Sequence, residues 1–511
     1  MAAGIFLSRV AGLIRERVFA HFFGNSDAGD AFKAALKIPN FLQNLFGEGV
    51  LSASFIPVYA RLMARGEHEE SDKVMSIVGS LLALATSILV VAGVWATPFL
   101  IDLIAPGFHN EKRLLTIHLV QIFFPGTGLL VMSAWCLGIL NSHHKFFLSY
   151  VAPVLWNAAI IITLIIFGHT RGQFDLAILT AWGLVLGSAL QFGIQLPTAL
   201  RLVNKFSPRL SLKLPAVREV IRNFFPVVTA RGVVQISAYI DNVLASFLPT
   251  GAVSALAYAQ TIYLLPVSLF GMSVSAAELP KMSRAVGSPQ EVAHTLQNHL
   301  NAGLKQIAFF VVPSVVSFLF LGDVIVSALF QTGEFTHQNS LYVWGVLAGA
   351  TVGLLASTLG RLYASTFYAL HDTRTPLRFA LLRVFITTGL GYFFALKLPS
   401  LLQIPISWGT AGLTASAGIA GWVEFLLLRR SLNRRIGLTG IEVIYTIKLW
   451  GSALVAALLA WGIKVTTVLY PPIVQAAMVL IPYGLSYLIM TDILGVSYAR
   501  QFMRRLMVTR I

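Results

Sequence analysis

Long apolar runs separated by short polar stretches dominate the chain. Each run is about as long as the roughly 20 mostly apolar residues that a membrane-spanning helix needs. Pro and Gly interrupt many of the runs, which transport helices tolerate where the freed backbone faces protein or a wet cavity. The pattern predicts an all-α membrane bundle of about 14 spanning helices. We expect them at 1–23, 31–59, 75–105, 114–140, 146–168, 174–200, 219–247, 252–280, 299–330, 340–369, 377–396, 408–428, 441–468 and 473–496.

Composition supports a membrane protein. Of the 511 residues, 56% are apolar and 11% are charged, whereas soluble domains carry roughly a quarter charged residues. This composition excludes a soluble monomer, and one membrane bundle accounts for the length better than several domains do. The single cysteine, Cys136, lies in an apolar run, which excludes a disulfide and a cysteine-based metal site within one chain.

The net charge of +16 is placed unevenly among the predicted loops. Odd-numbered loops hold only Lys112, Arg113, Arg171 and Lys397, whereas the even-numbered loops and the C-terminal tail are rich in Lys and Arg. The positive-inside rule then predicts cytoplasmic even-numbered loops and cytoplasmic N- and C-termini. We therefore expect a multi-pass protein of the bacterial inner membrane that contacts membrane lipids and does not bind nucleic acid.

Weak internal similarity predicts a repeat. Residues 45–61 resemble 269–284, and 140–148 resemble 370–380, in the same order and at nearly the same separation. An even number of helices per copy indicates a parallel repeat of two six-helix lobes, with two extra C-terminal helices outside it. The predicted divisions are an N-lobe at 1–200, a basic cytoplasmic linker at 201–218, a C-lobe at 219–435, and the last two helices with a basic cytoplasmic tail at 436–511.

Charged residues inside the first two predicted spans need an explanation. A charge at the bilayer centre costs at least roughly 2.5–3.5 kcal/mol, so such a side chain should face a partner, a wet cavity or the interface. At 100° per residue, five polar positions at the start of the second span and along it fall within an arc of about 60°, although Pro39 distorts the stripe. These positions are Asp30, Lys33, Lys37, Asn44 and Glu48.

Further cations flank this stripe. Arg9 and Arg15 lie on the preceding span, and Arg231 lies in the middle of the span at 219–247. One interpretation is an anion site, because a guanidinium binds phosphate bidentately and stays charged when partly dehydrated. The alternative is structural, with salt bridges that join Arg15 to Asp30 or Glu48.

Signatures of catalysis are missing from the sequence. It contains no GxxxxGK[ST], HExxH or GxSxG motif and no Cys-His spacing of a metal site. We therefore expect no enzyme activity, no cofactor and no metal. Transport would draw on the membrane potential, an ion gradient or consumption of the substrate on the far side.

Three motifs near the N-terminus carry a resemblance to a known family. They are SRVxGxxR at 8–15, DAFxxAxKxPN at 30–40 and EGxxSxxFxP at 48–57, and APGF at 105–108 adds a further match. With these motifs the chain resembles the MurJ (MviN) lipid II flippase family of the multidrug/oligosaccharidyl-lipid/polysaccharide exporter superfamily. The resemblance covers most of the chain in order. Typical members begin several residues earlier, so we expect the natural start to lie upstream.

The resemblance implies a V-shaped bundle whose two extra helices form a groove for a polyprenyl tail. It implies that lipid II, a polyprenyl-pyrophosphate-linked cell-wall precursor, is flipped to the outer leaflet by alternating access, for peptidoglycan synthesis and cell shape. Cavity arginines of the family are thought to hold the pyrophosphate. By motif, Ser8, Arg9, Arg15, Asp30, Lys37 and Glu48 match the family's cavity residues, and the predicted substrate-binding set adds Lys33 and Arg231 to these.

Two departures from the family pattern affect the expected site. Gln43 stands where the family has a cavity arginine, and Gln260 with Thr261 replaces an Asp-Arg pair. Our hypothesis is that Arg231 compensates for the missing cations. Three alternatives stay open: a flippase for another lipid-linked oligosaccharide, a cation-coupled drug exporter, and a non-transporting scaffold for cell-wall synthesis enzymes. The cationic stripe speaks against the exporter, and costly intramembrane charges speak against the scaffold.

Overall fold

The computed structural model describes residues 2–203 and 206–500, and it divides into two compact units. Unit 1 comprises Met1–Ser254 with Thr332–Phe335, and unit 2 comprises Ala255–Gln331 with Thr336–Ile511. Helices form all the regular structure of the described residues, apart from one isolated bridge between Thr332 and Phe335. The predicted all-α class is therefore confirmed.

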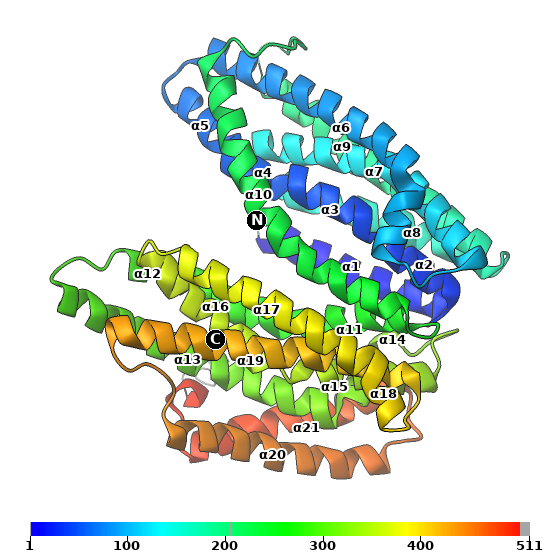
Figure 1. Ribbon diagram of the computed structural model, residues 1–511, viewed down its shortest axis with the longest axis vertical. Coiled ribbons are helices and arrows are strands. Elements are labelled where there is room, and N and C mark those ends of the chain that lie inside the picture. Colours follow the sequence, from blue (N-terminus) through cyan, green and yellow to red (C-terminus); the bar gives the residue numbers. More distant parts are fainter. Residues whose placement is uncertain (1, 204–205, 501–511) are drawn as a thin grey trace, which may run out of the picture. The chain divides into compact units, whose positions relative to one another are not determined.

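The helices of unit 1 vary widely in length (Figure 1). Four long helices, α6 to α9, pack against one another, and α1 packs against α8. The helices are α1 (Ala2–Phe23), α2 (Asp27–Ala35), α3 (Lys37–Phe46), α4 (Glu48–Ser54), α5 (Ile56–Ala64), α6 (His68–Ile104), α7 (Asn110–Ser142), α8 (Phe146–Phe167), α9 (Gln173–Arg201) and α10 (Pro215–Ser246).

Unit 2 contains the remaining helices, of which α11 begins just before the division (Figure 1). Within it, α19 packs against α15, α16 and α17, while α20 and α21 pack against each other. The helices are α11 (Ala252–Pro266), α12 (Ser273–Ser283), α13 (Pro289–Phe320), α14 (Gly322–Phe330), α15 (His337–Thr351), α16 (Leu354–Ala369), α17 (Arg374–Tyr392), α18 (Leu398–Leu401), α19 (Gly409–Ile436), α20 (Val443–Thr466) and α21 (Pro472–Ile493).

Ten helices of the described residues are long and apolar enough to cross a membrane. The count is eleven if α15 and α16, which meet at a bend of 41°, form one broken span. Each of these corresponds to a predicted span. The three predicted spans that are missing from this set, 1–23, 31–59 and 219–247, all carry charged side chains. The count of 14 therefore stays a prediction.

The predicted span at 31–59 is interrupted, as its prolines and glycines indicate, and three breaks divide it among α2 to α5. Pro39 is the third residue of α3 and has no N–H to donate to the preceding turn. Gly47 has an extended backbone, and a Cβ added there would lie 2.1 Å from the Gln43 carbonyl oxygen. Pro57 at the start of α5 again removes a donor. Each break thus lies at or close to a residue that fits poorly inside a helix.

The division into units differs from the predicted lobe boundaries at one helix. The sequence assigns 219–247 to the C-lobe, whereas α10 lies in unit 1 and packs against α3, α4 and α6. Its N-terminal half contributes Val217 and Val220 to a buried cluster that includes Phe55 and Trp135. The lobes of the proposed repeat are not tested by this packing and stay a prediction.

The two C-terminal helices are anchored in unit 2 by small residues and by tyrosine hydroxyls. Ala453 and Ala456 of α20 are fully buried, and small side chains let membrane helices approach closely. In α13, Pro313 has no N–H for the Phe309 carbonyl four residues earlier. The Tyr487 hydroxyl of α21 donates to that carbonyl oxygen over 2.7 Å. A tertiary hydrogen bond thus replaces the one that proline removes.

Candidate functional site

Buried charges in unit 1 are held in a short network on α1 and α2. Arg15 Nη2 lies 2.6 Å from Glu16 Oε1, and Lys33 Nζ lies 2.5 Å from Glu16 Oε2. The Lys33 ammonium also sits 4.3 Å from the centre of the Phe19 ring. One carboxylate therefore serves two cations, and the network keeps a net positive charge. The sequence interpretation missed Glu16, although its position beside Arg15 was a usable signal.

Asp30 lies apart from this network and is 1% exposed. Its carboxylate accepts hydrogen bonds from Lys112 Nζ and from the backbone N–H groups of Gly251 and Ser254, each over 2.8 Å. Lys112 Nζ also lies 2.9 Å from Asp27 Oδ1. Asp30 thereby ties α2 to the loop before α11 and to the first turn of α11. Its salt bridge is made with Lys112, and not with Arg15 as the structural alternative proposed.

The predicted polar stripe is consequently not continuous. Lys37 is half-buried at the start of α3, and its backbone carbonyl accepts a 2.6 Å hydrogen bond from the Tyr239 hydroxyl. Arg9 is exposed on α1, whereas Ser8 is half-buried. Glu48 and Arg231 also belong to the predicted site, but their side chains lie outside the described part of the structure.

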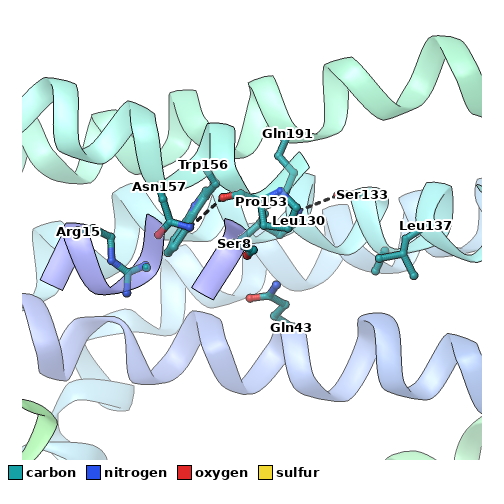
Figure 2. Close-up of a pocket in the computed structure, with 12 residues that line it drawn as sticks. Ser8, Arg15, Gln43, Leu130, Ser133, Leu137, Pro153, Trp156, Asn157 and Gln191 are labelled. Atoms are coloured by element: carbon teal, nitrogen blue, oxygen red, sulfur yellow. Dashed lines mark hydrogen bonds between the residues drawn. The ribbon is translucent and has the colours of Figure 1, made fainter. Parts of the chain in front are cut away.

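A pocket of about 300 Å³ lies inside unit 1, where α1, α3, α7, α8 and α9 meet (Figure 2). Two predicted site residues line it, and so does the glutamine that replaces a family arginine. In Figure 2 this glutamine points from α3 toward Ser8. The polar lining consists of Ser8, Arg15, Gln43, Ser133, Trp156, Asn157 and Gln191.

Hydrogen bonds organise the polar wall of the pocket. Gln191 Nε2 donates to Ser133 Oγ over 3.0 Å, and Ser133 Oγ donates to Gln195 Oε1 over 2.6 Å. Asn157 Nδ2 donates to the Pro153 carbonyl over 2.9 Å. These side chains are fixed by α7, α8 and α9, so the pocket presents a pre-formed polar surface. The sequence interpretation missed this wall, because uncharged polar residues in apolar runs give a weak signal.

Arg15 connects the charge network to the pocket. Its guanidinium carbon lies 4.8 Å from the centre of the Trp156 ring, and one nitrogen is bound to Glu16. A guanidinium has five N–H donors, so the contact with Glu16 leaves capacity for a further anion. Pockets with a few convergent polar groups are the usual form of a small-molecule site. The geometry suits a ligand that carries both a phosphate and uncharged hydrogen-bonding groups.

The second departure from the family pattern, Gln260 with Thr261, lies on α11. Thr261 Oγ1 donates to the Ala257 carbonyl of its own helix over 3.0 Å, and Gln260 is exposed. Among the described residues, no group of three or more His, Cys, Asp or Glu side chains could hold a metal ion.

Comparison with known proteins gives a consistent result. The family model described as "Lipid II flippase MurJ" matches residues 19–482. The lipid II flippase MurJ of Burkholderia cenocepacia is 30% identical over 436 residues, which cover 84% of this chain and 82% of that protein. A probable lipid II flippase MurJ of Buchnera aphidicola subsp. Acyrthosiphon pisum is 26% identical over 514 residues, covering 97% and 96%.

Solved structures show the same relationship. The chain matches "Lipid II flippase MurJ, inward closed conformation" with a TM-score of 0.79 and 27% identity over 98% of this chain and 99% of that one. An inward-facing multidrug resistance MATE family transporter of the MOP superfamily has a TM-score of 0.67 at 18% identity, covering 83% and 95%, which shows a shared fold alone. The resemblance seen in the N-terminal motifs is therefore confirmed, and this multi-pass membrane protein belongs to the lipid II flippase MurJ family.

Proposed function

We propose that this chain flips lipid II from the cytoplasmic to the outer leaflet by alternating access, for peptidoglycan synthesis. The observation that carries the proposal is the family match over residues 19–482. It is supported by a guanidinium, Arg15, at the edge of a polar pocket inside unit 1. The substrate is thus a polyprenyl-pyrophosphate-linked glycan whose headgroup the protein holds away from lipid.

Within this proposal, cationic side chains on α1 to α3 hold the pyrophosphate. Arg15 is best placed, because it lines the pocket and is oriented by Glu16 and Trp156. Arg9, Lys33 and Lys37 add positive potential along the same two predicted spans. Asp30 orders the loop before α11 through its backbone contacts.

The proposed architecture has fourteen spanning helices, with two six-helix lobes and the pair α20 and α21 beside the polyprenyl tail. The three segments that add to the eleven apolar spans carry the charges that a transport site requires. Both termini are cytoplasmic in this proposal, as the loop charges predict. The membrane is the bacterial inner membrane, where cell-wall synthesis enzymes are proposed partners.

Energy for transport comes from the membrane potential, an ion gradient or consumption of lipid II on the far side. Moving one charge through 100 mV supplies about 2.3 kcal/mol, which is enough to bias a transport cycle. The chain itself performs no bond-making step in this proposal.

Complementation tests the proposal. The resident lipid II flippase of a bacterium is depleted, this chain is expressed, and lipid II exposure on the outer leaflet is measured. We expect exposure to be restored by the wild-type chain and lost in Arg15→Ala, with Lys73→Ala, which changes an exposed ion pair with Glu69, as the control. Correct membrane insertion without lipid II exposure would contradict the assignment.

One observation favours a second candidate function. Gln43 and Thr261 stand where the family has cations, so the substrate could be another polyprenyl-pyrophosphate-linked glycan of the same class. The test is to repeat the depletion experiment in a strain that depends on a different glycan flippase. Rescue of that strain, without rescue of lipid II exposure, would favour the second candidate.

A further inference from the structure

The pocket of unit 1 is too small for a complete lipid-linked headgroup. Its volume is about 300 Å³, which is at the lower end of the roughly 300–1,000 Å³ of small-molecule sites. A disaccharide that carries a peptide needs far more space. The pocket can therefore enclose one ring-sized part of such a substrate while the rest lies outside it.

The inner wall of the pocket offers acceptors as well as donors. Asn157 is 4% exposed, and its Oδ1 has no hydrogen-bond partner in the described part of the chain. The indole N–H of Trp156 is likewise buried without an acceptor among the described residues. Leaving such groups unsatisfied is costly, which points to a ligand that fills the pocket. Since Asn157 Oδ1 can only accept, this ligand must bring donors of its own.

Gln43, on the opposite wall of the pocket, also offers an acceptor as well as donors. Its side chain lines the pocket and points toward Ser8 (Figure 2). An arginine at this place, as the family has, would present donors only, whereas a glutamine presents two N–H donors and a carbonyl acceptor. A group with hydroxyls, each of which donates and accepts, fits the glutamine better than a second phosphate does.

Arg15 fixes which part of the substrate lies in the pocket. In a polyprenyl-pyrophosphate-linked glycan, the first sugar is bonded directly to the pyrophosphate. If Arg15 holds the pyrophosphate at the pocket edge, the group next to it is that sugar. Its hydroxyl and N-acetyl groups match an amide-rich wall.

We propose that the pocket binds the first N-acetylhexosamine ring of the substrate, with Asn157, Gln191 and Gln43 as its hydrogen-bond partners and Arg15 on the adjacent pyrophosphate. This inference rests on the proposed function, because it assumes a polyprenyl-pyrophosphate-linked glycan. It adds a site of glycan specificity within unit 1 that is separate from recognition of the charge.

Binding of three probes to the full chain in lipid nanodiscs tests the inference. The probes are undecaprenyl pyrophosphate, the same lipid bearing one N-acetylglucosamine, and lipid II. We expect Gln191→Leu and Asn157→Leu to weaken binding of both glycosylated lipids about 10-fold, as loss of one buried hydrogen-bond partner does. Binding of undecaprenyl pyrophosphate should change less than about twofold, whereas Arg15→Ala should weaken all three.

Two further variants keep the test decisive. Gln43→Leu changes a half-buried side chain and is expected to fold even if Asn157→Leu does not, so it must show the same selectivity. Ser188→Ala is the matched control, because this buried hydroxyl on α9 donates to its own helix at Leu184 and does not line the pocket. Equal losses for bare and glycosylated lipids, or no loss for either, would overturn the sugar site.

Failure of the sugar site can be told apart from failure of the proposed function. If wild-type protein binds lipid II tightly but Gln43→Leu and Gln191→Leu show no selectivity, only the sugar site is wrong. If wild-type protein binds none of the three lipids and does not restore lipid II exposure, the proposed function is wrong as well.

Discussion

Glu16 is the carboxylate that compensates the positive charges of Arg15 and Lys33 in the first two predicted spans. Burying an ion is expensive, and a buried pair is stable only when geometry and hydrogen bonds compensate the lost hydration. Here one carboxylate meets both Arg15 and Lys33 within 2.6 Å. Arg15 and Ser8 could be predicted from the motif SRVxGxxR, whereas Glu16 beside Arg15 gives a weaker signal, because an acid next to an arginine is also common on exposed helices.

Glu16→Gln should therefore destabilise the protein strongly. The change leaves the Lys33 ammonium, 8% exposed, beside an uncharged amide, and breaking a buried pair costs roughly 3–5 kcal/mol. Thermal unfolding in detergent measures the loss. The double variant Glu16→Gln with Lys33→Met should recover part of it. Stability of Glu16→Gln equal to that of the exposed-pair variant Lys73→Ala would contradict this account.

His143, at the C-terminal end of α7, makes unit 1 sensitive to acid. Its Nε2 lies 3.0 Å from the Tyr59 hydroxyl, and burial lowers the pKa of His143 below its usual value of 6.5, although Asp72 acts in the opposite direction. Because the folded pKa lies below the unfolded one, stability is full above about pH 6.5 and declines as the pH falls further.

The midpoint temperature of thermal unfolding should consequently decrease when the pH is lowered from 8 to 5. The decrease should be smaller in His143→Gln. Glutamine keeps a partner for Tyr59 and removes the titrating group. His144→Gln, which changes the neighbouring loop histidine, is the matched control. An identical pH profile for wild type and His143→Gln would exclude this contribution.

At the scale of helices, prolines and glycines explain where continuity fails. Pro39, Gly47 and Pro57 mark the breaks of the second predicted span, and all three are visible in the sequence. The effect of each break is not visible, because it depends on which neighbour satisfies the freed backbone. In α13 a proline also removes a backbone hydrogen bond, but the helix continues through Pro313. There the Tyr487 hydroxyl donates to the freed Phe309 carbonyl.

Tyr487→Phe should reveal this help. It removes the only side-chain donor to the Phe309 carbonyl among the described residues, and a buried unsatisfied group costs about 1–3 kcal/mol. Tyr483→Phe is the matched control, because Tyr483 donates to the Pro313 carbonyl, which the regular helix pattern already satisfies. Thermal unfolding should show the larger loss for Tyr487→Phe. Equal losses would mean that the proline has no part in the effect.

At the scale of the whole molecule, fold class was the most predictable property. Apolar runs alone identified each of the eleven spans, because length and hydropathy are properties of single segments. The placement of α10 in unit 1 could not be predicted, since it depends on contacts with α3, α4 and α6 that lie far away in the sequence. The membrane orientation stays a prediction from loop charge and can be tested directly.

Single cysteines introduced into a Cys136→Ala background should report that orientation. Glu67→Cys lies between α5 and α6 in an even-numbered loop, and Arg171→Cys lies between α8 and α9 in an odd-numbered one. A membrane-impermeant thiol reagent added to intact spheroplasts should label Arg171→Cys and spare Glu67→Cys. The reverse pattern would invert the proposed topology.

The charged character of α1, α2 to α5 and α10 has a consequence for biogenesis. These are the segments absent from the set of strongly apolar helices, and each charge near the bilayer centre opposes entry into lipid by roughly 2.5–3.5 kcal/mol. The part of the chain that precedes α6 is thus less able than α6 to α9 to remain in the bilayer alone. Its stable integration must wait until α6 to α9 are synthesised and give its polar side chains a protein surface to face.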